Sequence, residues 1–258
     1  MSWNWIARLD ELRRGGIPAV VVTVTGGTGS APRDAGAKMI VRADGAFEGK
    51  IGGGHLEMLA IEEARRRVEI GESGSIRYPL GAKTGQCCGG VVDLFYEVVN
   101  AGPHLYVFGA GHVGQAVART LEGTPFTVHL VDERTEWVNA PQLPVGVVRH
   151  ESEWDEFARA ARWDARQTYV VIMTFRHDLD EKILEGILSS RRDLRYLGLI
   201  GSAAKWERFR QRLLQKGIHE AALSRVRSPI GLPVGGKAPA EIAISLGAEL
   251  LGIHYEKG

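Results

Sequence analysis

Short apolar runs, separated by polar and glycine-rich stretches, divide the first hundred residues of the 258-residue chain into predicted helices and strands. Trp5, Leu9 and Leu12 recur at helical spacing and predict an amphipathic helix within residues 2–14. The β-branched run at 19–24 predicts a buried strand. The same patterns predict four more strands and one longer helix, the strands at 38–41, 46–51, 75–80 and 91–99 and the helix at 56–70.

In the second half of the chain, strand and helix patterns alternate. Apolar strands are predicted at 105–108, 126–131, 145–148, 168–174 and 196–200, and helices at 113–121, 154–163, 179–188 and 203–215. This alternation favours a doubly wound parallel sheet, and Asn100–Pro103 reads as a linker. The expected fold class is therefore α/β: a mixed α+β domain at 1–99 and a Rossmann-like domain at 104–258.

A glycine turn follows the first strand of the second half. Gly109, Gly111 and Gly114 have the G-x-G-x-x-G spacing, between a predicted strand and a predicted helix. In that motif the first glycine permits a tight turn, the second lets backbone N–H groups approach a phosphate, and the third lets helix and strand pack closely. The start of the helix adds a partial positive charge. The turn, with His112 inside it, is thus a candidate anion site.

Asp132 ends the next apolar strand, about 20 residues further on, where a dinucleotide-binding unit places its ribose ligand. Two interpretations stay open: a contact to ribose, or a fold relic that caps the following helix. Ligands of such sheets bind beyond the carboxyl ends of the strands. His177 and Gly201–Ser202 follow later strands, so we expect both in the same crevice as the glycine turn and Asp132.

The composition restricts the function classes. With 44% hydrophobic and 24% charged residues the chain is able to bury a core, and its net charge of +1 does not favour nucleic acid or an anionic membrane. No apolar run of about 18 residues predicts a transmembrane helix, and no signal peptide is recognised at the start. A cytoplasmic location is expected.

The chain has two cysteines, Cys87 and Cys88, which are adjacent and flanked by glycines. Neighbouring thiols cannot join distant segments, and they rarely reach disulfide geometry without strain. With no other cysteine, a zinc site is not favoured. The pair is either incidental or chemical, and soft sulfur suits thiophilic metals and persulfide exchange.

Four polar features have both a functional and a plain structural interpretation. The small-residue loop at 25–36 is a connection, or an anion-binding loop anchored by Arg33. His55, after three glycines, is a surface residue or a ligand contact. Lys237, after Gly235 and Gly236, belongs to a second anion cradle or to a plain loop. The predicted helix at 203–215 has a basic side, which extends to the residue after the helix and is interpreted first as a solvated face. It consists of Lys205, Arg208, Arg212 and Lys216.

Several of these segments together resemble those of the xanthine dehydrogenase accessory proteins, the XdhC/CoxI family. The similar segments follow one another over nearly the whole chain and are Thr28–Arg33, Gly49–Glu57, Gly85–Gly90, Phe108–Gly114, Thr174–Asp178, Gly198–Ser202 and Pro229–Lys237. The resemblance implies a two-domain protein that binds the molybdenum cofactor and protects it while a cysteine desulfurase installs its sulfido ligand. Such a protein then helps to deliver the cofactor to xanthine dehydrogenase. Its role is that of a chaperone rather than an enzyme, and we expect a homodimer.

Within that resemblance, the phosphate or pterin is expected against the Gly109–Gly114 turn or the Gly235–Lys237 loop. The molybdenum would then face Cys87 or Cys88, with Cys88 favoured because it directly precedes two glycines, as in the family pattern. One alternative is an NAD(P)-dependent oxidoreductase, supported by the turn and Asp132, although no proton-relay pair is recognised. Another is a docking module that uses the basic face around Arg208 and Arg212.

Overall fold

The computed structural model describes residues 4–29, 33–80, 90–161, 163, 165–190 and 193–256. The chain divides into two compact units, unit 1 at Met1–Gly102 and unit 2 at Pro103–Gly258. Each unit has its own sheet and its own buried core, and each is described by itself below.

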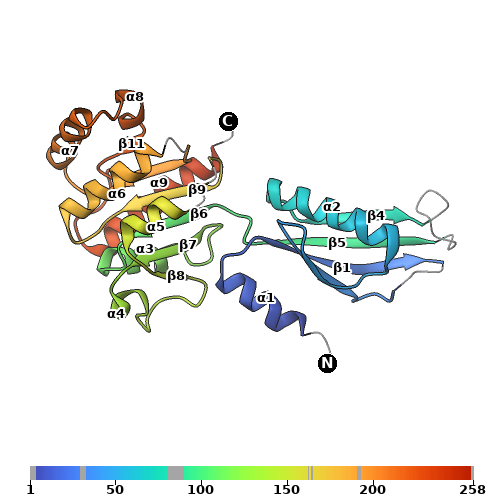
Figure 1. The fold of residues 1–258 in the computed structure, drawn as a ribbon. Coiled ribbons are helices and arrows are strands. Elements are labelled where there is room, and N and C mark those ends of the chain that lie inside the picture. Colours follow the sequence, from blue (N-terminus) through green and yellow to red (C-terminus); the bar gives the residue numbers. More distant parts are fainter. Residues whose placement is uncertain are drawn as a thin grey trace. The chain divides into compact units, whose positions relative to one another are not determined.

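Unit 1 is an antiparallel sheet of five strands in the order β3-β2-β1-β5-β4, with one helix on each face (Figure 1). Its elements are α1 (Trp5–Arg14), β1 (Ala19–Thr28), β2 (Lys38–Arg42), β3 (Phe47–Gly49), α2 (Gly54–Ile70), β4 (Gly74–Pro79) and β5 (Val91–Val99). Alternate residues of β1 face opposite sides: Val20 and Val22 pack under α2, whereas Val21 packs under α1 with Leu12. The mixed α+β architecture predicted for this half is confirmed.

Strand β1 is longer than the apolar run that predicted it. It continues through Gly26 and Gly27 to Thr28, paired with β5, after a register shift between Val24 and Gly26. The sequence indicated a loop there because glycines usually weaken strands. The structure gives the physical reason for glycine: a Cβ on Gly27 would lie 2.4 Å from the carbonyl oxygen of Val91.

Unit 2 is a parallel sheet of six strands in the order β11-β10-β9-β6-β7-β8. Its elements are β6 (His104–Phe108), α3 (His112–Thr120), β7 (Thr127–Asp132), α4 (Thr135–Val138), β8 (Val148–Glu151), α5 (Trp154–Ala160), β9 (Thr168–Ile172), α6 (His177–Ser189), β10 (Tyr196–Leu199), α7 (Ala203–Gln215), α8 (Glu220–Leu223), β11 (Val226–Arg227) and α9 (Pro239–Tyr255). The order is that of a doubly wound Rossmann-like sheet, as predicted, and the strand order reverses between β6 and β9.

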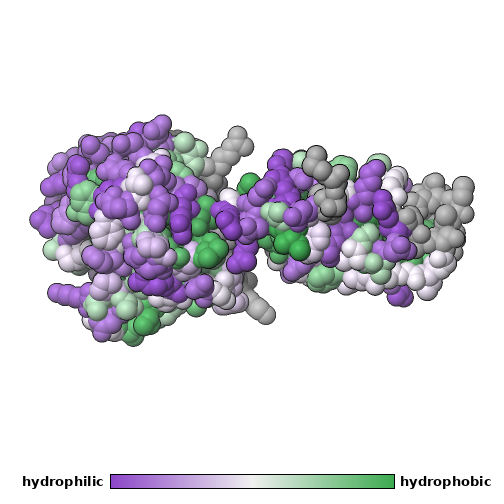
Figure 2. Space-filling model, turned by 90° about the horizontal axis from the view of Figure 1, so that it is seen from below, coloured by the Kyte–Doolittle hydropathy of each residue, from purple (hydrophilic) through white to green (hydrophobic). Residues whose placement is uncertain are grey.

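Helices cover both faces of this sheet (Figure 1). Helices α3 and α9 pack on one face, over Leu105 and Val107 of β6, and α5, α6 and α7 pack on the other, over Phe108. Figure 2 shows mainly hydrophilic residues on the visible face of each unit, with apolar residues in small groups. Within the described ranges, none of the helices combines the length and the apolar character needed to cross a bilayer.

Candidate functional site

The glycine turn lies at the carboxyl edge of the parallel sheet, at the point where the strand order reverses. Gly109 has φ +120°, and a Cβ there would lie 2.5 Å from the carbonyl oxygen of Met173, just beyond β9. A Cβ on Gly114, in the first turn of α3, would lie 2.0 Å from the carbonyl oxygen of Gly109. Two of the three glycines are therefore required by close packing within the protein itself.

Gly111 differs from these two. It precedes α3 as its N-cap and makes no side-chain cap hydrogen bond, and a Cβ built on it meets no described atom within 4 Å. The first N–H groups of a helix have no partner within the helix, and the helix dipole is positive there. The space in front of Gly111 thus suits an anion such as a phosphate.

Asp132 lies beside this turn, but its carboxylate is already bonded within the protein. The side chain is fully buried and accepts a hydrogen bond from the Ala110 backbone N–H at 2.8 Å. Arg134 donates to both carboxylate oxygens, from Nε at 2.9 Å and from NH2 at 2.8 Å. This ion pair raises the pKa of Arg134 above its ordinary value. Asp132 therefore holds the glycine turn in place.

Arg134 is enclosed by aromatic side chains. Its guanidinium carbon lies 4.5 Å from the ring centre of Phe175, 5.1 Å from that of Trp137 and 5.8 Å from that of Trp154. The exposed ring of His112 meets Trp137 edge-on, with 5.0 Å between ring centres. The residues beside the glycine turn thus combine aromatic rings with an arginine that is paired with Asp132.

His177 is exposed and begins α6, immediately after the carboxyl end of β9. The structure therefore brings the glycine turn, His112, Asp132 and His177 to the same edge of one sheet. Asp180, one turn further along α6, was not among the predicted site residues. Its buried carboxylate accepts hydrogen bonds from the Thr174 hydroxyl at 2.6 Å and from Lys205 Nζ at 2.6 Å.

The expectation of a solvated basic face on α7 is wrong at Lys205, which is buried. Its side chain is 6% exposed, and its ammonium group also donates to the Ile200 carbonyl at 2.9 Å. A Cβ on Gly201 would lie 2.6 Å from the Lys205 chain, so glycine at this position makes room for the lysine. The strand–Gly-Ser–helix pattern was the only signal of this arrangement in the sequence.

Two further cations of this side of the helix also pair with acids of α6. Arg212 pairs with Glu181 at 2.9 Å, and Lys216 pairs with Glu185 at 2.5 Å. Arg208 instead donates to the Ala204 carbonyl in its own helix. The basic side of α7 is therefore largely a set of contacts between two helices.

The backbone of the loop that contains Lys237 is already bonded to a carboxylate of the protein. The Glu241 carboxylate accepts a hydrogen bond from the Ala238 backbone N–H at 3.1 Å, and a Cβ on Gly236 would lie 2.8 Å from the same oxygen. Lys237 itself is exposed. A phosphate at this loop would compete with a carboxylate that is already bound.

In unit 1, two of the predicted site segments adjoin strand ends that pair with each other. Thr28 of β1 pairs with Val91 of β5, so the loop after β1, with exposed Arg33, leaves the same end of the sheet as the connection between β4 and β5. Exposed His55 lies in the first turn of α2, which begins after β3. Cys87 and Cys88 lie in that β4–β5 connection, outside the described residues.

The sequence analysis also did not identify a row of three histidines on adjacent strands. His104 Nδ1 lies 2.9 Å from His129 Nε2, and His129 Nδ1 lies 3.0 Å from His150 Nε2. Tyr106 stacks on His129 with 4.3 Å between ring centres. Burial, and then the neighbouring histidines, hold the pKa of His129 well below its ordinary 6.5. From each strand to the next, the histidine lies two residues beyond the register partner of the previous one, and one histidine in each of three strands was the available sequence signal.

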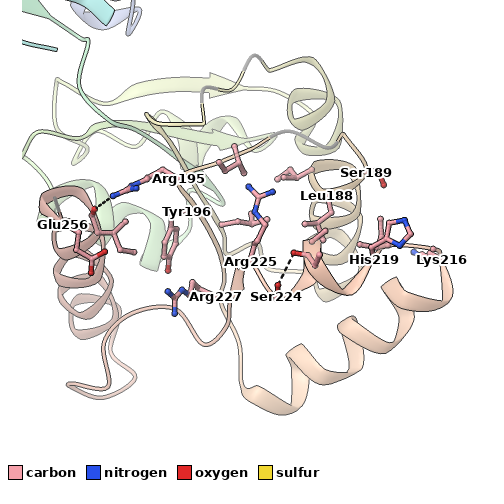
Figure 3. Close-up of a pocket in the computed structure, with 18 residues that line it drawn as sticks. Leu188, Ser189, Arg195, Tyr196, Lys216, His219, Ser224, Arg225, Arg227 and Glu256 are labelled. Atoms are coloured by element: carbon pink, nitrogen blue, oxygen red, sulfur yellow. Dashed lines mark hydrogen bonds between the residues drawn. The ribbon is translucent and has the colours of Figure 1, made fainter. Parts of the chain in front are cut away.

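A cleft of about 940 Å³ opens at the opposite, amino edge of the parallel sheet. Figure 3 shows Tyr196, Arg225 and Arg227 along its wall. Arg225 pairs with Asp193 at 2.8 Å, and Arg195 donates to the carbonyl of Ile253 at 2.9 Å. Among the described residues, none of those predicted to bind the cofactor lines this cleft, which is therefore separate from the glycine turn.

The fold is that of a two-unit protein whose Rossmann-like unit has an open glycine turn at the carboxyl edge of its sheet. Residues 105–250 match the family model of the XdhC Rossmann domain, and residues 12–79 match that of the XdhC and CoxI family. The chain belongs to the XdhC and CoxI family.

Three relatives give this family a context. The chain is 31% identical over 253 residues to the uncharacterized protein YqeB of Escherichia coli (strain K12), covering 96% of this chain and 46% of YqeB. It is 28% identical over 166 residues to a probable xanthine dehydrogenase subunit of Bacillus subtilis (strain 168), covering 62% of this chain and 45% of that protein. It is 26% identical over 281 residues to the molybdenum cofactor insertion chaperone PaoD of Escherichia coli (strain K12), covering 96% and 87%.

The chain spans about half the length of the first two of these relatives. Among solved structures, it is similar to a xanthine dehydrogenase from Bacillus halodurans, with a TM-score of 0.53, 20% identity and coverage of 98% of this chain and 96% of that one. At that identity the similarity shows the fold alone. The family match and the chaperone relative give no support to the NAD(P) alternative.

Proposed function

We propose that this protein binds the molybdenum cofactor as a cargo and helps to insert it into an enzyme of the xanthine dehydrogenase type. The observation that carries the proposal is the similarity to a molybdenum cofactor insertion chaperone across 96% of this chain, which includes both units. The relative named as a probable xanthine dehydrogenase subunit supports the class of recipient enzyme.

We place the phosphate of the cargo at the glycine turn. Gly111 leaves open space in front of the first turn of α3, where an anion is stabilised by N–H groups and by the helix dipole. The alternative loop before α9 is less suitable, since Glu241 already bonds to its backbone. This contrast supports the glycine turn over the loop before α9 as the place of the phosphate.

We further propose a role for the cysteines in binding the metal. Cys88, or Cys87 beside it, supplies a thiolate to the molybdenum end of the cofactor while a cysteine desulfurase installs the sulfido ligand. The protein acts in the cytoplasm as a homodimer and releases the sulfurated cofactor to its recipient. The preference of thiophilic metals for soft thiolate ligands supports this assignment.

The test is anaerobic purification of the full chain from molybdenum-replete cells, with metal analysis and detection of the oxidised pterin released from the protein. The wild-type protein is expected to carry both, and Cys88→Ser to lose most of both. Cys87→Ser, which removes the adjacent thiol, is measured in parallel because either thiol is a candidate ligand. A wild-type protein free of molybdenum and pterin would refute cofactor binding, and normal loading and delivery in the variant that lacks both thiols would refute the thiol role alone.

A further inference from the structure

A second hollow, lined wholly by unit 1, has no role in the function proposed above. Its volume is about 650 Å³, within the range of small-molecule sites. It lies where the first turn of α1 meets β2, β3 and the loop that precedes β2. Its lining consists of Trp5, Arg33, Gly36, Ala37, Lys38, Glu48, Gly49 and Lys50.

The charges around this hollow are unbalanced. Three of its lining residues are cations, Arg33, Lys38 and Lys50, and none of them forms an ion pair with any residue in the described ranges. Glu48 is the one acid in the lining, and it is bound by Arg8 at 2.7 Å. Because the acid is already neutralised, the hollow has a net positive charge that suits an anionic guest.

One wall of the hollow is aromatic and held in place. Trp5 is the first residue of α1, and the Asn4 side chain fixes the start of that helix by accepting the Ala7 backbone N–H at 3.2 Å. Lys38 Nζ lies 4.8 Å from the centre of the Trp5 ring and donates to the Thr23 hydroxyl at 2.8 Å. A half-buried indole beside a fixed cation is a surface on which a flat ring stacks.

The backbone at the rim also leaves room. Gly36 has φ +94°, and a Cβ built there meets no described atom within 4 Å. Gly49, across the hollow, has φ +86°. Both positions favour glycine because of their conformation, and neither adds a side chain that would narrow the entrance.

We propose that this hollow is a binding site for a flat heteroaromatic ring that carries a phosphate monoester, with the ring against Trp5 and the phosphate between Arg33 and Lys50. A pterin monophosphate and a nucleoside monophosphate share this chemistry. The residues that line the hollow all belong to unit 1, and the inference is tested by ligand affinity rather than by cofactor loading.

The experiment is titration calorimetry of the purified full chain with three probes: a 6-substituted pterin monophosphate, guanosine monophosphate and inorganic phosphate. At least one ring-bearing probe is expected to bind about tenfold or more tightly than inorganic phosphate, because stacking adds to the ionic contact. The ring-bearing probe whose binding is weakened by the variants in the hollow identifies the source of the ligand. Equal affinity for all three probes, or no binding of either ring-bearing probe, overturns the proposal.

Variants then locate the site. Lys50→Glu and Arg33→Glu are each expected to weaken the ring-bearing probe by about tenfold or more, since each replaces an attraction by a repulsion. Trp5→Leu is expected to weaken that probe while leaving inorganic phosphate unchanged. Arg13→Glu is the matched control: Arg13 is exposed on the last turn of α1 and does not line the hollow.

The two charge reversals concern exposed side chains, so folding is checked by circular dichroism and is expected to be unchanged. If Arg13→Glu weakens binding as much as the two reversals in the hollow, the effect is one of overall charge and the site is refuted. Unchanged binding by both Lys50→Glu and Arg33→Glu refutes it as well. Molybdenum content of the same variants is a separate readout, which reports on the proposed function and not on this site.

Discussion

Arg134 binds Asp132 through both carboxylate oxygens, at 2.9 and 2.8 Å, although the two residues are only two positions apart in the chain. The acid lies at the strand end where a Rossmann-like fold commonly contacts ribose, but here it is buried and bonded to Arg134 and to the glycine turn. Of the two interpretations that the sequence left open for Asp132, these bonds favour a structural role over a contact to ribose.

Replacing Arg134 by methionine is expected to destabilise the protein by about 2–4 kcal/mol, because Asp132 would be left as an uncompensated buried charge. The free energy of unfolding in urea measures this effect. Arg225→Met is the control, since Arg225 and Asp193 form an exposed ion pair, for which a loss of at most about 1 kcal/mol is expected. Equal losses in the two variants would contradict the structural role of Arg134.

The three glycines of the turn are expected to separate into two classes when each is changed to alanine. Gly109→Ala and Gly114→Ala should each cost more than about 2 kcal/mol, since the new methyl group collides with a backbone oxygen. Gly111→Ala should leave the unfolding free energy within about 1 kcal/mol, because its methyl group meets open space.

The molybdenum and pterin content of the same glycine variants is the second measurement. Gly111→Ala is expected to fold normally but to retain several-fold less molybdenum and pterin, because the methyl group occupies the space proposed for the phosphate. Normal loading of a stably folded Gly111→Ala variant would move the phosphate away from this turn.

The buried pair of Lys205 and Asp180 is expected to behave as a unit. Lys205→Met should cost about 3–5 kcal/mol, as it leaves the Asp180 carboxylate unpaired, and adding Asp180→Leu should recover part of that loss. Lys216→Met, at a more exposed pair, is expected to cost at most about 1 kcal/mol. Denaturation of the wild type, Lys205→Met, Asp180→Leu and the double variant completes the cycle, and strictly additive losses would show that the pair is not coupled.

The row of histidines predicts a loss of stability in mild acid. His129 and His150 both have a pKa below 6.5 in the folded protein, chiefly because of burial. In the unfolded chain both take up protons near pH 6.5, so the unfolded state binds more protons and stability falls as the pH drops below that value. Each histidine contributes at most about 1.4 kcal/mol per pH unit.

Thermal unfolding between pH 8 and pH 5 measures this dependence. His129→Leu is expected to show a shallower decline below pH 6.5 than the wild type, whatever its stability at pH 8. His219→Leu removes an exposed histidine and should keep the wild-type slope. A wild-type stability that stays constant or rises toward pH 5 would be the opposite of the expected sign.

Much of the fold was predictable because its signals are local. The helix predicted at 203–215 has those bounds in the structure, and the glycine turn lies between β6 and α3 as its spacing indicated. The extension of β1 was missed, because the need for Gly27 arises from its close approach to Val91 in another strand. The burial of Lys205 was missed for a similar reason, since its partner Asp180 lies in a different helix.

The ion pairs between α6 and α7 have a consequence for how other molecules meet this protein. Lys205, Arg212 and Lys216 each lie against an acid of α6, so their charges largely cancel within a few ångströms of the surface. Arg208 is left as the cation of this side without an acidic partner among the described residues. An approaching macromolecule would therefore meet almost no long-range electrostatic pull here, and any contact with α7 would form slowly and depend on shape at close range.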